Sequence, residues 1–135
     1  MRTLAVGIGG ALGALFRWML GNLSTPLFPW GTLVANLMGC WILGWLTGAT
    51  RHRSWLPEAW RLGIGTGFVG ALTTFSTWDG EMMYLWISER RWTAALYLTL
   101  TLVGGILLAW RGCSQGERWA EKKRGNASPQ GGSAQ

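Results

Sequence analysis

Four stretches of this chain each approach the length of about 20 apolar residues that a helix needs to cross a lipid bilayer. They cover residues 4–21, 31–50, 62–87 and 92–110. Inside a bilayer no water is present to bond the peptide groups, so such segments fold as helices. The sequence therefore predicts an all-α membrane protein, in which residues 1–111 form one unit with four transmembrane helices.

The composition agrees with this class of protein. Hydrophobic residues make up 49% of the chain and charged residues only 13%, against about 25% charged residues in an average soluble domain. Residues 112–135 are rich in Gly, Ser, Gln, Lys and Glu, and we expect them to form a polar, disordered tail. The first segment is glycine-rich and contains Arg17, which favours a retained span over a cleaved secretory signal.

The third segment contains a polar run, at residues 70–78, that is unusual inside an apolar stretch. Four hydroxyl side chains fall within five residues, two aromatic side chains stand three apart, and glycines precede the run: Thr73, Thr74, Ser76, Thr77, Phe75, Trp78, Gly65 and Gly67. Glycine loosens a helix, and hydroxyl groups compete for its backbone partners. We expect a broken transmembrane helix, which is tolerated only where it is buried in protein or lines a water-filled cavity. The break is therefore a candidate ion or substrate site.

The net charge of +6 indicates an orientation in the membrane. With four spans, both termini and the second loop share one side, and that side holds nine basic residues against two on the other. The nine are Arg2, Arg51, Arg53, Arg61, Arg111, Arg118, Lys122, Lys123 and Arg124, and the two are Arg90 and Arg91. The positive-inside rule then places both termini in the cytoplasm. No basic stripe is interleaved with aromatic residues, so we expect no nucleic-acid partner.

Glycine spacing indicates closely packed helices. Three glycine pairs stand four residues apart, which lets helix backbones approach one another in lipid: Gly9 and Gly13, Gly44 and Gly48, Gly63 and Gly67. Four short helices packed this tightly leave no water-filled passage within one chain. We therefore expect an oligomer, most simply a two-fold dimer, with any conduction path shared between subunits.

Polar residues in the other spans add candidates. Asn36 lies early in the second span, where its amide either forms an interhelical hydrogen bond or meets a ligand. In the fourth span Tyr97, Thr101 and Gly105 recur every four residues and line one face, which fits either plain packing or a polar track. Phe75 and Trp78 also share a face, and the default role for such a pair is packing in the core.

The chemistry of these groups suits two kinds of ion. Amide, hydroxyl and phenol groups donate hydrogen bonds without a fixed charge, and aromatic ring edges carry partial positive charge, so the set suits a small anion. Several neutral donors in series also allow the anion to leave. Carbonyl oxygens freed at a helix break suit a small cation such as Na⁺. One site can thus hold a structural cation while anions pass nearby.

These motifs resemble the Fluc, or CrcB, fluoride channel family over about residues 5–110. The matching stretches are GGALGALFRW at 9–18, GTLVAN at 31–36 and GFVGALTTFST at 67–77, and the last is highly specific. The resemblance implies an antiparallel dimer of four-helix subunits with two fluoride pathways. It also implies a central structural Na⁺, held by the backbone carbonyls of Gly70 and Thr73 from each subunit and not transported.

The resemblance also implies roles for individual side chains. Trp78 stands where a second pore phenylalanine is usual, and Gly105 where another hydroxyl is usual. The implied fluoride pathway consists of Asn36, Phe75, Trp78, Tyr97 and Thr101. Residues implied to lie in a vestibule or to be structural are Arg17, Ser76, Thr77 and Glu81.

The function implied by the resemblance is passive fluoride export across the bacterial plasma membrane. A small drug/proton antiporter is an alternative, but it needs a carboxylate deep in the first helix, which here holds Arg17 and no acid. A structural membrane subunit is a second alternative, although it leaves the hydroxyl-rich break unexplained. An enzyme is not expected, because the single histidine, His52, lies in a charged loop without paired carboxylates or an activated nucleophile. Cys40 and Cys113 are too few and too far apart to suggest a zinc site.

The charge asymmetry conflicts with one implication of the resemblance. Subunits that insert in both orientations should show little charge bias, yet nine basic residues stand against two. Either the tail charges are weak determinants and the chain forms a homodimer, or it pairs with an oppositely oriented homologue.

Overall fold

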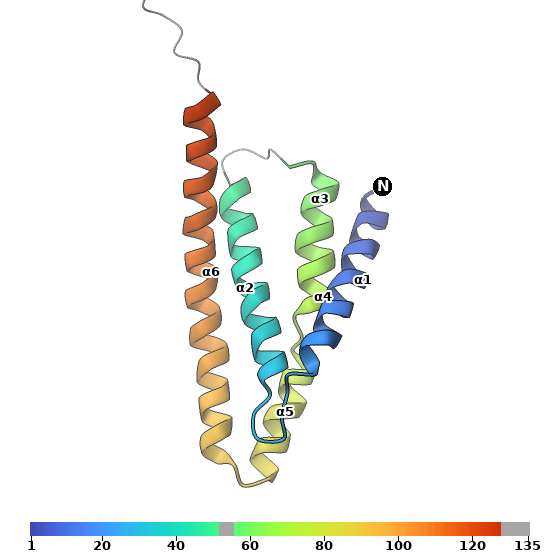
Figure 1. The fold of residues 1–135 in the computed structure, drawn as a ribbon, viewed down its shortest axis with the longest axis vertical. Coiled ribbons are helices and arrows are strands. Elements are labelled where there is room, and N and C mark those ends of the chain that lie inside the picture. Colours follow the sequence, from blue (N-terminus) through green and yellow to red (C-terminus); the bar gives the residue numbers. More distant parts are fainter. Residues whose placement is uncertain (52–55, 128–135) are drawn as a thin grey trace, which may run out of the picture.

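The computed structural model describes residues 1–51 and 56–127, and its regular elements in these ranges are all helices (Figure 1). His52, Arg53 and the last eight residues, 128–135, lie outside them. The elements are α1 (Arg2–Gly21), α2 (Trp30–Thr50), α3 (Glu58–Leu62), the π-helix η1 (Gly63–Val69), α4 (Gly70–Leu72), α5 (Ser76–Ile87) and α6 (Arg91–Ala127).

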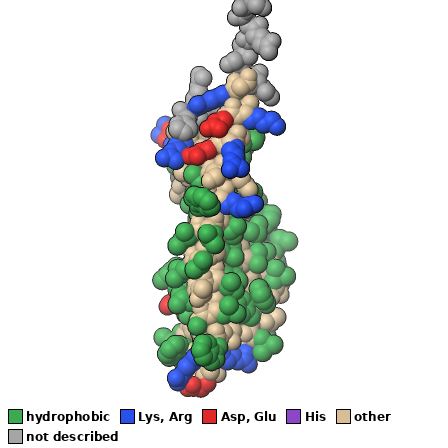
Figure 2. All heavy atoms as spheres, turned by 90° about the vertical axis from the view of Figure 1, so that its left-hand side faces the viewer, with side chains coloured by type: hydrophobic (Ala, Val, Ile, Leu, Met, Phe, Trp, Pro, Cys, Tyr) green, Lys and Arg blue, Asp and Glu red, His purple; other side chains and the backbone are tan. Residues whose placement is uncertain are grey.

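Three of these helices, α1, α2 and α6, are long and apolar enough to cross a membrane. On the face drawn in Figure 2, hydrophobic side chains form a broad band over the middle of the molecule, and most charged side chains gather toward its two ends. This distribution is typical of a protein embedded in a bilayer, where apolar residues face lipid and charged groups lie at the interfaces. The all-α membrane fold predicted from the sequence is confirmed at this level.

The helices are arranged as two closely packed pairs. Helix α2 packs along α6, and α1 packs along η1 and α4, while contact between the two pairs is sparser. Both pairs rely on glycine. A methyl group at Gly13 would collide with the backbone oxygen of Phe68, and one at Gly48 would collide with that of Cys113. The close packing expected from the glycine pairs is confirmed.

The third apolar segment is interrupted, as predicted. Helix α4 ends at Leu72, Thr73 has an extended backbone (φ −79°, ψ 150°), and α5 begins at Ser76. Before the break the segment packs against α1, and after it α5 packs against α6. The break therefore moves the chain from one helix pair to the other and leaves non-helical backbone between them.

Helix α6 corrects the expectation of a disordered tail. It continues without interruption to Ala127, so residues 112–127 are helical rather than disordered. Gly112 and Gly116 allow α6 to approach the backbone of α2, and an ion pair of 2.8 Å joins Glu117 to Arg51. Composition suggested disorder because the stretch is polar, but its glycines pack against α2, and Gln115 and Glu117 bond Trp41 and Arg51 on that side.

Candidate functional site

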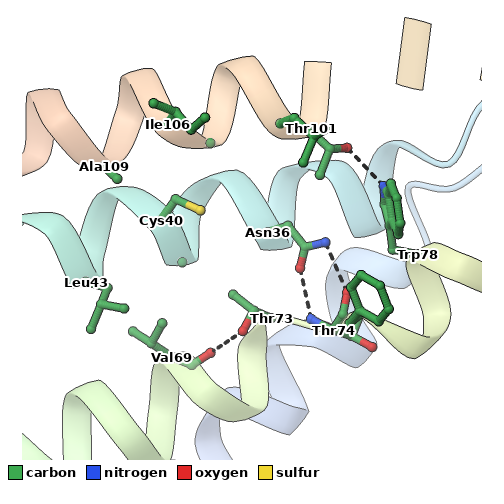
Figure 3. Close-up of a pocket in the computed structure, with 14 residues that line it drawn as sticks. Asn36, Cys40, Leu43, Val69, Thr73, Thr74, Trp78, Thr101, Ile106 and Ala109 are labelled. Atoms are coloured by element: carbon green, nitrogen blue, oxygen red, sulfur yellow. Dashed lines mark hydrogen bonds between the residues drawn. The ribbon is translucent and has the colours of Figure 1, made fainter. Parts of the chain in front are cut away.

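A groove of about 530 Å³ lies where the helix break faces α2 and α6 (Figure 3). None of the residues that line it carries a formal charge. They are Asn36, Gly39, Cys40, Leu43, Val69, Thr73, Thr74, Phe75, Trp78, Thr101, Leu102, Gly105, Ile106 and Ala109. The groove is therefore apolar along most of its length, with amide, hydroxyl and indole groups near the break.

Asn36 holds the break in place through both ends of its side-chain amide. Its Nδ2 donates to the carbonyl oxygen of Thr74 (3.1 Å), and its Oδ1 accepts from the Thr74 N–H (2.9 Å). Figure 3 shows this pair of bonds running from α2 to the extended backbone. The amide thus supplies hydrogen-bond partners for the N–H and the carbonyl of Thr74, which lie outside any helix, as buried polar groups require. One N–H of the Asn36 amide remains for another acceptor.

Two carbonyl groups at the break have lost the donors that a continuous helix would supply. In an α-helix the N–H of Thr74 would bond the carbonyl of Gly70, and the N–H of Thr77 would bond that of Thr73. Here the Thr74 N–H is donated to Asn36, and the Thr77 N–H to the Thr74 hydroxyl (3.3 Å). Gly70 is exposed, with open space beside its α-carbon. These oxygens are hard ligands of the kind that Na⁺ prefers, so the residues expected to hold a cation fit that role.

Thr73 lies tightly between its own helix and α2. Its hydroxyl donates to the carbonyl of Val69 (3.0 Å), and its methyl group lies where a side chain at Gly39 would otherwise be. Any residue larger than glycine at position 39 would force this methyl group to move. Helix α2 therefore contacts the break at two points, Gly39 and Asn36.

Aromatic and hydroxyl side chains meet on the other side of the groove. The rings of Phe75 and Trp78 lie 5.4 Å apart, and Phe75 is 76% exposed. The indole Nε1 of Trp78 donates to Thr101 Oγ1 on α6 (3.2 Å), as Figure 3 shows. Thr101 in turn donates its own proton to the carbonyl of Tyr97 (2.8 Å).

A second polar cluster lies next to the groove and is more deeply buried. Thr32 Oγ1 donates to Glu81 Oε1 (2.8 Å), and the phenol of Tyr97 donates to Glu81 Oε2 (2.7 Å). Tyr97 is fully buried and packs edge-on against Phe28, so it does not line the groove. The Glu81 carboxylate on α5 thus accepts hydrogen bonds from hydroxyl groups on α2 and α6, and it joins the three helices.

The remaining predicted residues are more peripheral. Ser76 and Thr77 are exposed in the first turn of α5, where Thr77 accepts a bond from the Thr74 hydroxyl (3.1 Å). Arg17 is half-buried on α1 and is not among the residues that line the groove. The structure thus brings together Asn36, Thr73, Phe75, Trp78 and Thr101, and it separates Arg17 from them.

Three residues of the groove and of the polar cluster beside it were not predicted from the sequence. Thr32 and Cys40 stand four residues before and after Asn36, so they share its face of α2, and this spacing was a usable signal. Thr74 was noted only as one of several hydroxyl residues. Its contribution comes largely from its peptide group, for which the residue type gives no indication.

Known proteins resemble this chain along most of its length. Residues 4–113 match the model of a family described as CrcB-like protein, Camphor Resistance (CrcB). A protein of Bacillus cereus named fluoride-specific ion channel FluC 1 is 41% identical over 119 residues, which cover 84% of this chain and 86% of the relative. The fluoride-specific ion channel FluC of Acidobacterium capsulatum is 44% identical over 87% of this chain and 98% of its own length. The fluoride-specific ion channel FluC of Marinobacter nauticus is 46% identical over 78% of this chain and 86% of its own length.

Proposed function

The chain belongs to the CrcB-like family, and on this premise we propose that it is a fluoride-selective ion channel of the bacterial cell membrane. The observation that carries the proposal is the groove at the helix break, in which uncharged hydrogen-bond donors and aromatic rings meet along an otherwise apolar surface. The family is one of ion channels rather than enzymes. Passage of the ion, rather than chemical conversion, is accordingly the activity to be explained.

The lining of the groove suits a small, strongly hydrated anion. Amide, indole and ring-edge groups can replace part of the hydration shell of the ion, and no formal charge is present to hold it permanently. Fluoride is the smallest halide and the strongest hydrogen-bond acceptor among them. A narrow path whose donors compensate for lost water therefore favours fluoride over chloride.

The driving force needs no coupled reaction. Hydrogen fluoride crosses lipid undissociated, ionises at cytoplasmic pH and is trapped as the anion. An interior-negative membrane potential favours exit of one negative charge by about 2.3 kcal/mol per 100 mV. A passive channel is thus sufficient to lower the cytoplasmic fluoride concentration.

We further propose that the segment from α3 to α5 forms a fourth transmembrane element. Figure 1 shows it running alongside the other helices from the N-terminal end of the molecule to the turn before α6. Its start is joined to α1 by the ion pair between Arg2 and Glu58 (2.7 Å). At the opposite end Arg90 donates to the carbonyl of Pro26 (2.8 Å). Charged groups at both ends and a mostly apolar stretch between them, with Asp79 and Glu81 as the acidic exceptions, fit a span that is broken in the middle.

The groove is open on one side, so a complete pathway needs a second subunit. An antiparallel dimer is the arrangement we propose, formed either by two copies or with an oppositely oriented homologue. Phe75, which is 76% exposed, is available to face such a partner. Membrane lipid would cover the remaining apolar surface.

A structural Na⁺ at the dimer axis fits the same geometry. The carbonyl oxygens of Gly70 and Thr73 have lost their helical donors, and a pair from each subunit would supply hard oxygen ligands. When bound, the ion would hold the two breaks together by electrostatic attraction. This chain's own residues, above all Asn36, keep the extended backbone in the required shape.

Fluoride efflux from liposomes tests the proposed function directly. Full-length protein, reconstituted in liposomes loaded with potassium fluoride, should release fluoride to a fluoride-selective electrode once valinomycin allows potassium to follow. Liposomes loaded with potassium chloride serve as the control and should release little chloride. Fluoride release no faster than from protein-free liposomes would contradict the proposal, and proton-coupled export of a cationic drug would favour the antiporter.

A further inference from the structure

Most hydroxyl protons of the side chains that line the groove already have acceptors. The hydroxyl proton of Thr73 goes to Val69, that of Thr101 goes to Tyr97, and that of Thr74 goes to Thr77. These hydroxyl groups therefore present mainly lone pairs to the groove, and lone pairs repel an anion. The N–H groups among the lining side chains are the second amide hydrogen of Asn36 and the indole hydrogen of Trp78.

The indole N–H of Trp78 has an acceptor that it can exchange. It bonds Thr101 Oγ1 at 3.2 Å, a long neutral hydrogen bond across the groove from α5 to α6. A hydrogen bond to an ion is about twice as strong as one between neutral groups. Thr101 keeps its bond to the Tyr97 carbonyl if the indole leaves, so the exchange leaves no buried proton unpaired.

Neighbouring aromatic rings hold the indole of Trp78 in one orientation. It lies 5.4 Å from the ring of Phe75 and 6.3 Å from that of Tyr97, which is itself fully buried. Contacts on two sides limit the rotation of the indole, so its N–H stays directed across the groove toward α6. Figure 3 shows the ring beside the break, with its N–H on the side of Thr101.

We propose that Trp78 donates a hydrogen bond to the permeating fluoride, which takes the place of Thr101 Oγ1 as acceptor of the indole N–H. This inference rests on the proposed function and assigns a specificity-determining role to a residue of this chain. Thr101, expected to donate to the ion, instead acts as the resting acceptor that keeps the indole in position. Because fluoride accepts hydrogen bonds more strongly than chloride, the exchange favours fluoride.

Nuclear magnetic resonance of the indole groups tests the contact itself. The chain has eleven tryptophans, so ¹⁵N-tryptophan labelling gives at most eleven indole N–H signals, and Trp78→Phe identifies the one from position 78. Titration of the full-length wild type with sodium fluoride should move this signal downfield, whereas sodium chloride at the same concentration should move it much less. Thr101→Val removes the resting acceptor, so half of the shift should occur at a lower fluoride concentration. A signal that ignores fluoride, or a higher half-shift concentration in Thr101→Val, would overturn the proposal.

Flux measurements separate the loss of the N–H from a change of ring size. Trp78→Phe and a variant with benzothienylalanine at position 78, a ring of similar shape with sulfur in place of N–H, should both lose roughly tenfold of the fluoride efflux, as expected for one hydrogen bond to an ion. Trp110→Phe is the matched control, because Trp110 is 71% exposed on α6 and does not line the groove. If the wild type conducts fluoride and both position-78 variants conduct equally well, the role of Trp78 is refuted while the channel function stands. If the wild type itself releases no fluoride, the proposed function fails.

Discussion

Asn36 shows how one residue can serve the structure of a site and its chemistry together. Its amide forms two hydrogen bonds with the peptide of Thr74, 38 residues away in the chain, and it still has one N–H to offer. The two interpretations left open by the sequence, an interhelical hydrogen bond and a ligand contact, are therefore compatible. The structure establishes the first, and the second remains a prediction.

Replacement of Asn36 by aspartate tests this residue. In Asn36→Asp a carboxylate oxygen takes the place of Nδ2 and faces the carbonyl of Thr74, and the donor directed toward the anion is lost. We expect fluoride efflux from liposomes to fall by at least roughly tenfold, since an unpaired polar group and a repelled anion both raise the barrier. Asn22→Asp, at the exposed end of α1, is the control with the same chemical change and should conduct like the wild type. Unchanged efflux in Asn36→Asp would show that the assigned lining is wrong.

Cys40 offers a second test, because its thiol lies in the groove one turn beyond Asn36. A small methanethiosulfonate reagent adds a group to the sulfur, and we expect it to slow fluoride efflux by obstructing the path. The effect should disappear in Cys40→Ala and persist in Cys113→Ala, each compared with its own untreated sample. Slowing that follows Cys113 instead would place the path elsewhere.

At the scale of elements, the break determines which helices meet. Helix α4 packs with α1, and α5 packs with α6, so an unbroken helix could not maintain both contacts. The π-helix before the break, Gly63–Val69, contains three glycines and packs closely on α1. Wide helical turns of this kind occur frequently at functional sites. The packing of α1 on this element therefore supports the position of the break.

Paired alanine substitutions in α1 test that packing. Gly13 lies against the backbone of Phe68, whereas Gly7 has open space around it. In an exposed helix position, alanine is more stable than glycine by about 0.5–1 kcal/mol, so Gly7→Ala should not lower the thermal stability in detergent. Gly13→Ala should destabilise the protein by about 1–3 kcal/mol, because overpacking forces the backbones apart. Equal effects of the two substitutions on the melting temperature would contradict the close approach.

Across the molecule as a whole, most charged side chains lie toward the two ends, and a band of hydrophobic side chains lies between them on the face drawn in Figure 2. Helix α6 extends beyond the band and carries basic residues on its last turns, including Arg118, Lys122 and Arg124. These charges belong to a helix joined to α2 by the Arg51–Glu117 ion pair rather than to a free tail. Because the helix holds these charges at one end of the molecule, we expect them to contribute to its orientation in the membrane.

Reporter fusions at the C terminus test the orientation and with it the dimer. The positive-inside rule favours a cytoplasmic C terminus for most molecules of this chain. We expect a reporter that is active only in the cytoplasm to give a strong signal, and alkaline phosphatase, active only outside, to give a weak one. Replacing Arg118, Lys122, Lys123 and Arg124 by glutamine should lower the signal of the cytoplasmic reporter relative to that of alkaline phosphatase. Strong signals from both reporters on the unmodified chain would exclude an obligatory partner of opposite orientation.

Much of the architecture is encoded locally and could be predicted from the sequence. Hydropathy predicted the three helices of membrane-spanning length, the hydroxyl-rich run predicted the interrupted segment, and glycine spacing predicted the closely packed backbones. These properties depend on neighbours within one or two helical turns, so they can be recognised before any tertiary contact is known. The helical stretch at residues 112–127 was missed because its first part packs against α2 through Gly112, Gly116 and Trp119, a tertiary contact that composition does not reveal.

The pairing of the polar groups, in contrast, depends on tertiary packing. That Asn36 holds the peptide of Thr74, and that the indole of Trp78 meets Thr101 23 residues later, depends on the relative position of separate helices. The sequence determined which donors and acceptors this protein has and on which helix faces they lie. Which donors stay free for an ion follows from packing, because a hydroxyl or amide bonds the acceptor nearest in space and not the one nearest in the chain.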